Sequence, residues 1–310
     1  MPELAFLFPG QGSQYVGMGK EFYEEFPRAR EIFSLADEIL GFSLSRLCFE
    51  GPEEELRLTA NTQPALLTVS YIAYELLGVE PDIACGHSLG EYSALVAAGA
   101  ISFSVALRLV RQRGRYMQEA VPVGEGAMAA ILGLPFEVIS PILSEVKSGV
   151  VEVANWNSEE QIVIAGHKRA VEEAIEKLRP PRSVWLPVSA PFHTSLMKPA
   201  EARLAQDLDQ VEFHDLKFPI ITNVEARIIQ GGEEARQALK RQVSRPVLWW
   251  PSLQVLREKG INKVAEVGAG RVLSGLMKRA ARNWGQPIAI FSCENSPGLR
   301  QLRNELSRAT

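Results

Sequence analysis

The stretch Ile83-Ala-Cys-Gly-His-Ser-Leu-Gly90 decides how this chain is interpreted, because residues 86–90 fit the pattern Gly-x-Ser-x-Gly. A short apolar run precedes the pattern, and a helix-like stretch, residues 91–98, follows it. A strand, a sharp turn and a helix form the context in which this pattern makes a nucleophile elbow. We therefore predict an α/β fold with the Ser88 hydroxyl exposed at a turn. An ordinary helix entry with glycines at its start is the alternative.

The two glycines of the pattern have a physical role in this prediction. A turn this tight brings strand and helix close together, so a Cβ at Gly86 or Gly90 is expected to collide. The helix starts directly beneath the serine, and its free N–H groups and dipole then face any oxyanion that forms there. Residues 4–8 predict a buried strand that runs into the glycine-rich loop 9–14. That loop is either a plain turn or a backbone N–H donor held toward the site.

Composition excludes several classes of protein. The chain has 310 residues, of which 46% are hydrophobic and 23% charged, with a net charge of −4. These values indicate a globular protein with no signature of nucleic-acid binding. The three cysteines, Cys48, Cys85 and Cys293, are far apart and form no C-x-x-C pair. We therefore expect no disulfide framework, no metal site and a reducing compartment, the cytoplasm. No apolar run reaches the length of a signal core or a membrane span.

Residues 104–121 predict an amphipathic helix with one residue out of place. Helical spacing puts Arg113 on the apolar stripe, between Val110 and Met117. An unpaired buried charge costs several kcal/mol, so this guanidinium needs a partner. The partner is either a structural carboxylate, or water at the core edge, or a substrate anion; the pattern leaves these readings open.

Residues 126–188 have a different sequence pattern, with apolar segments of strand length. Strand-length segments occur at 127–132, 150–156, 161–165 and 183–188, and helical segments at 136–145 and 168–178. The resulting order, β-α-β-β-α-β, is the ferredoxin-like arrangement. We therefore predict a large α/β domain, residues 1–124 and 195–310, with an inserted small domain at 125–194.

Two further patterns give local expectations. Gln63-Pro64 predicts the start of a helix that runs to Leu77, since proline is tolerated in a first helical turn. Gly268-Ala-Gly270 after a strand hints at a dinucleotide fingerprint, but Leu273 occupies the position of the third glycine. We discount NAD binding on that ground.

Among the four histidines, His193 is the candidate base. It lies between Pro191 and Pro199 at the predicted domain border, where a cleft is expected. His87 adjoins the serine and is expected to point away from it in a structural role. His167 and His214 lie in polar or loop-like segments and are expected to be solvated.

Several stretches together resemble the malonyl-CoA:acyl carrier protein transacylases over essentially the full length of the chain. They combine in an order that is specific to that family, although none is specific alone. The matching stretches are Gly10-Gln-Gly-Ser-Gln14, Gly86-His-Ser-Leu-Gly-Glu-Tyr92, Arg113-Gly-Arg-Tyr-Met-Gln-Glu-Ala120, Asn155-Trp-Asn-Ser158, Gln161-Ile-Val-Ile-Ala-Gly166, Pro191-Phe-His-Thr194, Pro246-Val-Leu-Trp249 and Glu266-Val-Gly268. The resemblance implies an α/β-hydrolase-like large domain with a ferredoxin-like insert.

The resemblance also implies a role for individual residues. Ser88 is the acylated nucleophile, His193 its general base, and Arg113 the group that holds the malonyl carboxylate. The remaining implied roles are an oxyanion hole from the backbone N–H groups of Gln11 and Leu89, orientation of His193 by the backbone carbonyl of Gln242, and a site lined by Asn157, His87 and Phe192. Because no aspartate is found as a third member, we expect a Ser-His dyad.

The implied reaction moves malonyl from malonyl-CoA to the phosphopantetheine thiol of acyl carrier protein, by a ping-pong mechanism, in fatty acid biosynthesis. It needs no cofactor and no metal, since CoA and phosphopantetheine only carry the substrate. Phenylalanine in Pro191-Phe-His193 resembles the malonyl-type motif, whereas methylmalonyl-type enzymes usually have serine there. The alternatives are a discrete polyketide-type acyltransferase, a serine thioesterase or esterase, and a non-catalytic module that binds carrier protein. We expect neither a nucleic-acid nor a membrane partner.

Overall fold

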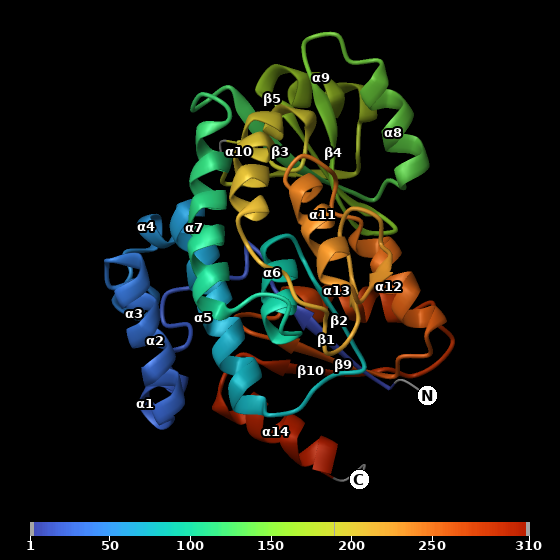
Figure 1. The fold of residues 1–310 in the computed structure, drawn as a ribbon. Coiled ribbons are helices and arrows are strands. Elements are labelled where there is room, and N and C mark those ends of the chain that lie inside the picture. The colour runs from blue at the N-terminus through green and yellow to red at the C-terminus, as the bar shows by residue number, and fades with distance from the viewer. Residues whose placement is uncertain (1–2, 189, 308–310) are drawn as a thin grey trace.

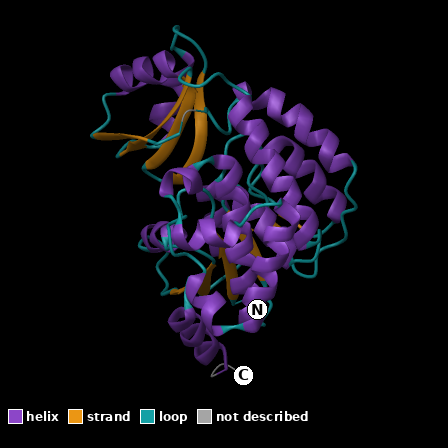
Figure 2. Cartoon of the chain, turned by 90° about the vertical axis from the view of Figure 1, so that its left-hand side faces the viewer, coloured by secondary structure: helices purple, strands orange, loops and turns teal. Residues whose placement is uncertain are grey.

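The chain folds around two β-sheets, as the computed structural model of residues 3–188 and 190–307 shows (Figure 1). Within these residues, six strands form the first sheet in the order β10-β9-β1-β2-β7-β8, and four form the second in the order β4-β5-β3-β6. Figure 2 shows the two sheets as separate groups of strands among the helices. The predicted α/β class is therefore confirmed.

The first sheet is parallel except at one edge, where β8 pairs antiparallel with β7. Its central strand, β1, is buried along its whole length. Continuous apolar runs of this kind are typical of parallel strands that are covered on both faces. The strands are β1 (Leu4–Phe8), β2 (Ile83–Gly86), β7 (Ile220–Ile221), β8 (Ile228–Ile229), β9 (Lys263–Val267) and β10 (Ala289–Cys293).

Helices cover both faces of this sheet. Phe6 and Phe8 of β1 belong to the core cluster that includes α5, α6 and α7, while Ala5 and Leu7 belong to the cluster that includes α12 and α13. This division follows from the alternation of side chains along a strand. The helices outside the second sheet are α1 (Lys20–Glu25), α2 (Pro27–Leu40), α3 (Leu44–Glu50), α4 (Glu53–Arg57), α5 (Thr59–Leu77), α6 (Leu89–Ala97), α7 (Phe103–Glu119), the 3₁₀ turn η1 (Ser195–Met197), α10 (Lys198–Asp209), α11 (Gly232–Gln242), α12 (Trp249–Glu258), α13 (Val272–Ala281) and α14 (Ser296–Ser307).

The second sheet is antiparallel and has its own apolar cluster. Figure 1 shows it at the top of the view, with α8 and α9 beside it. Its elements occur in the expected β-α-β-β-α-β order: β3 (Gly126–Leu132), α8 (Phe136–Ser144), β4 (Val151–Ser158), β5 (Gln161–His167), α9 (Lys168–Leu178) and β6 (Arg182–Trp185). The segment between α11 and α12 is connected to β4 of the second sheet through backbone hydrogen bonds of Val247 with Ala154 and Trp156.

The start predicted for one helix is wrong. α5 begins at Thr59, so Pro64 lies inside the helix and not in its first turn. A proline there has no N–H to donate to the carbonyl of Ala60. The Arg111 guanidinium donates to that carbonyl instead, at 2.6 Å. A side chain from α7 therefore supplies the hydrogen bond that the helix itself lacks, and the local sequence contains no sign of it.

The described part of the chain contains no helix that is both long and apolar enough to cross a membrane.

Replacing Arg179 with glycine is expected to stabilise the protein by about 1 kcal/mol. Arg179 ends α9 in a left-handed backbone conformation, with φ of 44°, and its side chain is exposed. Glycine adopts this conformation without a steric penalty. The measurement is the free energy of unfolding in denaturant.

Lys177→Gly is the matched control, because Lys177 lies in the last turn of the same helix. It is expected to lower stability by about 1 kcal/mol. A loss of stability in Arg179→Gly as large as in this control would contradict the interpretation.

Candidate active site

Ser88 occupies the sharp turn between β2 and α6. Its φ is 52°, in the left-handed region that a residue with a side chain rarely adopts. An ideal Cβ on Gly86 would lie 1.9 Å from the backbone carbon of Gly90, and one on Gly90 would lie 1.9 Å from the carbonyl oxygen of Phe8. Both glycines are therefore required by close backbone approach, and the turn presents the serine hydroxyl.

A cavity of about 90 Å³ lies beside this serine, and its walls include Met128 and Asn155 of the second sheet and the turns that follow β1 and β2. Most residues that the sequence selected line it: Gln11, His87, Ser88, Leu89, Arg113, Phe192 and His193. The other lining residues are mostly apolar and were not predicted from the sequence: Met117, Met128, Asn155, Leu186 and Val188. Gln242 and Asn157 are not among the lining residues, and reach the site through other groups.

Ser88 and His193 are in direct hydrogen-bond contact. Ser88 Oγ lies 2.8 Å from His193 Nε2, and His193 Nδ1 lies 2.9 Å from the carbonyl oxygen of Gln242. A carbonyl only accepts, so Nδ1 carries the proton and Nε2 is left to accept from the serine. His193 itself has a left-handed backbone, with φ of 62°.

Electrostatics keep this imidazole neutral. Burial, together with the positive charge of Arg113, lowers the pKa of His193 to about 3, while the hydrogen bond to the Gln242 carbonyl acts in the opposite direction. A neutral imidazole at this distance can accept the proton of a serine hydroxyl. The pair can therefore perform nucleophilic catalysis.

Arg113 is buried, as its place on the apolar stripe of α7 indicates, with 1% of its surface exposed. Its Nη1 donates to Gln63 Oε1 at 2.7 Å, and its Nη2 donates to Gln242 Oε1 at 2.9 Å and to Ser88 Oγ at 3.1 Å. In the described residues no carboxylate forms an ion pair with it, and its Nε has no hydrogen-bond partner. A cation is thus held beside the serine by neutral groups.

The predicted oxyanion donors lie on the same cavity. Leu89 is the first residue of α6, so its N–H has no acceptor within the helix. Gln11 lies in the glycine-rich loop after β1, and its side chain donates to Thr59 Oγ1 at 3.1 Å. The loop packs tightly against the elbow, since a Cβ on Gly10 would lie 2.2 Å from the His87 carbonyl oxygen.

Asn157 contacts a lining residue of the cavity. Its Oδ1 lies 2.8 Å from Nε2 of His87, and both His87 and Asn155 line the cavity. Both asparagines lie on β4, whose pairing with β5 is irregular next to them. His87 lines the cavity and also has this structural bond.

Sequence reasoning missed three polar residues around the site: Gln63, Glu91 and Asn223. Gln63 accepts from Arg113, Asn223 Oδ1 accepts from the Ser88 N–H at 2.7 Å, and Glu91 Oε2 accepts from the Asn223 N–H at 3.0 Å. The usable signal was a glutamate in a helix that has no other charged residue.

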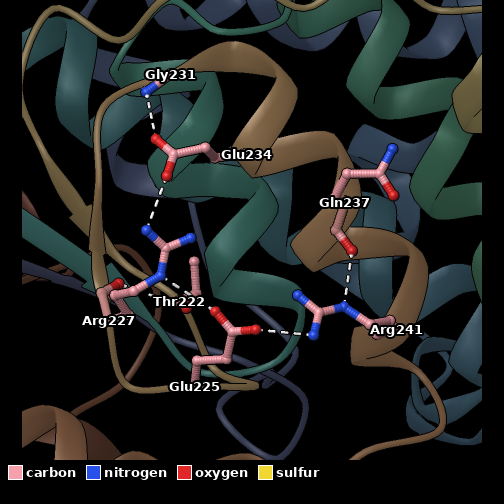
Figure 3. Close-up of polar contacts among 7 residues, drawn as sticks. All are labelled: Thr222, Glu225, Arg227, Gly231, Glu234, Gln237 and Arg241. Carbon is pink, nitrogen blue, oxygen red and sulfur yellow. Dashed lines mark hydrogen bonds and ion pairs between the residues drawn. The ribbon is translucent and has the colours of Figure 1, made fainter.

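Ion pairs at the surface connect the two segments that carry Asn223 and Gln242 (Figure 3). Arg241, at the end of α11, pairs with Glu225 at 2.8 Å in the turn between β7 and β8. Arg227 of the same turn pairs with Glu225 at 3.2 Å and with Glu234 of α11 at 2.7 Å. The turn and the helix are therefore held together next to the site.

Other nucleophiles and metal sites lack support in the described residues. The three cysteines are free and buried, and burial raises the pKa of Cys293 to about 12 and that of Cys85 as well. A thiol that stays protonated is a poor nucleophile. No group of three or more His, Cys, Asp or Glu in this part of the chain could hold a metal ion.

Comparisons with known proteins agree on one family. A model described as acyl transferase domain matches residues 5–295. The chain is 48% identical over 290 residues to "Malonyl CoA-acyl carrier protein transacylase" of Bacillus subtilis (strain 168), covering 91% of this chain and 92% of the relative. It is 46% identical over 287 residues to the protein of the same name from Escherichia coli (strain K12), covering 90% and 93%.

Solved structures give the same result. The transacylase of that name from Coxiella burnetii superposes with a TM-score of 0.94 at 40% identity, over 99% of this chain and 98% of that chain. A malonyl-transacylase described in complex with a type II PKS acyl-carrier protein superposes with a TM-score of 0.94 at 42% identity, over 98% and 99%.

The rate at which a fluorophosphonate modifies Ser88 is expected to show no titration step near pH 6.5. The reason is that the pKa of His193 lies far below its ordinary value, so the imidazole remains an acceptor at mildly acidic pH. Second-order inactivation rates from about pH 5 to about pH 8 measure this.

Ser88→Ala is the control for labelling elsewhere, and His193→Ala gives the rate without the imidazole. A fall in rate with an apparent pKa near 6.5 that is absent from His193→Ala would show that the imidazole titrates normally.

Proposed function

Because the chain belongs to the acyl transferase domain family, we propose that it transfers a malonyl group from malonyl-CoA to the phosphopantetheine thiol of acyl carrier protein. Its relatives at 46% and 48% identity are named for this activity. The observation that carries the proposal is Arg113, a buried guanidinium that forms no ion pair with the described residues and lies 3.1 Å from the hydroxyl of Ser88. The pathway is fatty acid biosynthesis.

The first half-reaction forms an ester on Ser88. Its Oγ attacks the thioester carbonyl of malonyl-CoA while His193 Nε2 takes the hydroxyl proton. The carbonyl oxygen becomes an oxyanion between the N–H groups of Gln11 and Leu89, and one such donor is worth about 3 to 4 kcal/mol. The C–S bond then breaks, His193 returns the proton to the CoA thiolate, and malonyl remains on the serine.

The second half-reaction runs through the same groups in reverse. His193 takes the proton of the phosphopantetheine thiol, the sulfur attacks the ester carbonyl, and the Ser88 oxygen leaves with that proton. The cavity walls formed by Met117, Met128 and Phe192 disfavour water, which would hydrolyse the ester. CoA leaves before the carrier protein reacts, so the kinetics are ping-pong. CoA and phosphopantetheine carry the acyl group, and the steps use no metal or cofactor.

Arg113 determines the selectivity for the acyl group. Its planar guanidinium matches a carboxylate with two parallel hydrogen bonds. Its Nη atoms are hydrogen-bonded to neutral amide oxygens, which partly solvate the charge without neutralising it. An acetyl group leaves the buried cation without an anion, and sites of this kind discriminate strongly. A serine esterase or thioesterase gives this arginine no purpose.

The same proposal includes the domain organisation. Residues 1–124 and 195–310 form an α/β-hydrolase-like catalytic domain, and residues 125–194 form a ferredoxin-like insert. The separate apolar cluster between β3 and α9 supports this division. The cytoplasm is the expected compartment, since all three thiols are free.

Malonyl-CoA alone is expected to add one malonyl mass to the peptide that contains Ser88. Mass spectrometry of the intact protein and its digest measures the adduct. Holo acyl carrier protein should remove it within seconds, whereas water should remove it slowly.

Ser88→Ala is the control, and it should acquire no adduct. Rapid loss of the adduct to water with no transfer would identify a thioesterase. Transfer to a polyketide carrier protein in preference to the fatty acid carrier would favour the polyketide-type alternative.

Arg113→Ala is expected to lower kcat/KM for malonyl-CoA by about a hundredfold or more and to change that for acetyl-CoA much less. The buried cation interacts only with the acyl group that has a carboxylate. Parallel measurement of both kcat/KM values gives the ratio, and an unchanged ratio would remove the role assigned to Arg113.

A further inference from the structure

Glu91 is a buried carboxylate to which the proposed reaction gives no role. It lies in the first turn of α6, three residues after Ser88, and none of its surface is exposed. Its Oε2 accepts from Gln242 Nε2 at 2.7 Å and from the Asn223 N–H at 3.0 Å. Its Oε1 has no hydrogen-bond partner in the described part of the chain. Oε2 therefore makes both hydrogen bonds of the Glu91 side chain.

The Gln242 amide connects this carboxylate to the acyl-binding arginine. Its Nε2 donates to Glu91 Oε2 and to the Ser88 carbonyl oxygen at 3.0 Å, and its Oε1 accepts from Arg113 Nη2. The two ends of an amide are nearly equal in shape but opposite in hydrogen-bonding character. A flipped amide would place its NH₂ group against the guanidinium and its oxygen against the carboxylate. Glu91 disfavours the flipped form, together with the Ser88 carbonyl and Arg113, and so helps to fix which end faces Arg113.

Asn223 connects the same carboxylate to the nucleophile. Glu91 accepts from the backbone N–H of Asn223. The Asn223 side chain accepts from the Ser88 N–H at 2.7 Å and donates to the Gly86 carbonyl oxygen at 2.7 Å. These bonds fasten the backbone of the turn at Gly86 and at the N–H of Ser88. Loss of the Glu91 acceptor would free two donors that now share one oxygen.

We propose that Glu91 is a positioning residue: it fixes the Gln242 amide and Asn223, and thereby the orientation of Arg113 and of the Ser88 turn. The inference rests on the proposed function, since its readout is the choice between malonyl and acetyl.

The acceptor, and not the charge, is the property that this role needs. Burial raises the pKa of Glu91 to about 7, against the opposing hydrogen bonds from Gln242 and Asn223 and the positive charge of Arg113. A proton on Oε1, which has no hydrogen-bond partner among the described residues, leaves Oε2 able to accept from both donors. A glutamine at this position can place its own carbonyl oxygen where Oε2 now lies.

The test compares Glu91→Leu, which removes the acceptor, with Glu91→Gln, which retains it, in the full chain. Glu91→Leu is expected to lower kcat/KM for malonyl-CoA by about tenfold or more, and the malonyl-to-acetyl ratio of kcat/KM by a similar factor. Glu91→Gln is expected to keep both within about threefold of the wild type. Destabilisation alone would reduce the amount of active protein and leave the ratio unchanged.

Asp37→Leu is the matched control, since Asp37 also anchors a backbone N–H, that of Ser45, and lies on α2 outside the site. It should lose stability and keep the malonyl-to-acetyl ratio. If Glu91→Leu does not fold, Glu91→Asp takes its place, because its shorter side chain withdraws the acceptor. Its ratio should fall by several-fold.

Two results would overturn the inference: an unchanged ratio in the Leu or Asp variant, or an equal loss in the Gln variant. Failure of the wild type itself to accept malonyl would instead reject the proposed function.

Discussion

A positive charge held in the interior without an ion pair in the described part of the chain is the constraint on which this site depends. Arg113 is surrounded by amide oxygens from two helices and lies over the ring of Tyr92, at 5.4 Å from its centroid. Such groups hydrogen-bond a cation but leave its charge uncancelled, and an uncompensated buried charge is costly. An incoming carboxylate removes this cost. Relief of this cost therefore contributes to the free energy with which an anionic acyl group binds.

The same charge acts on the histidine. Arg113 contributes to the low pKa of His193, so the free protein holds a neutral base next to its serine. In the proposed reaction the malonyl carboxylate offsets that positive charge. The imidazolium that forms as Ser88 attacks then becomes easier to stabilise, because its repulsive neighbour has been neutralised. Substrate binding and base strength are thus coupled through one guanidinium, and an acyl group without a carboxylate obtains neither benefit.

Sequence patterns located the groups that act locally. Residues 86–90 placed Ser88 on a turn, and helical spacing placed Arg113 inside, where the structure has it. Contacts between distant segments could not be predicted: Glu91 is 132 residues from Asn223 and 151 from Gln242. The prediction of where α5 begins was wrong for the same reason. Arg111 of another helix donates to the Ala60 carbonyl, which receives no hydrogen bond from Pro64. The division into two domains stays a prediction.

The acceptor that faces His193 Nδ1 belongs to the main chain of residue 242. In triads that use aspartate or glutamate, a single codon change can delete the group that orients the imidazole. Here every possible amino acid at position 242 still has a carbonyl oxygen, so no missense mutation can erase this partner. Substitutions there can alter only the side chain, which faces Arg113 and Glu91. Under the proposed function, variation at this position therefore bears on acyl selectivity, and the acceptor for His193 Nδ1 is retained.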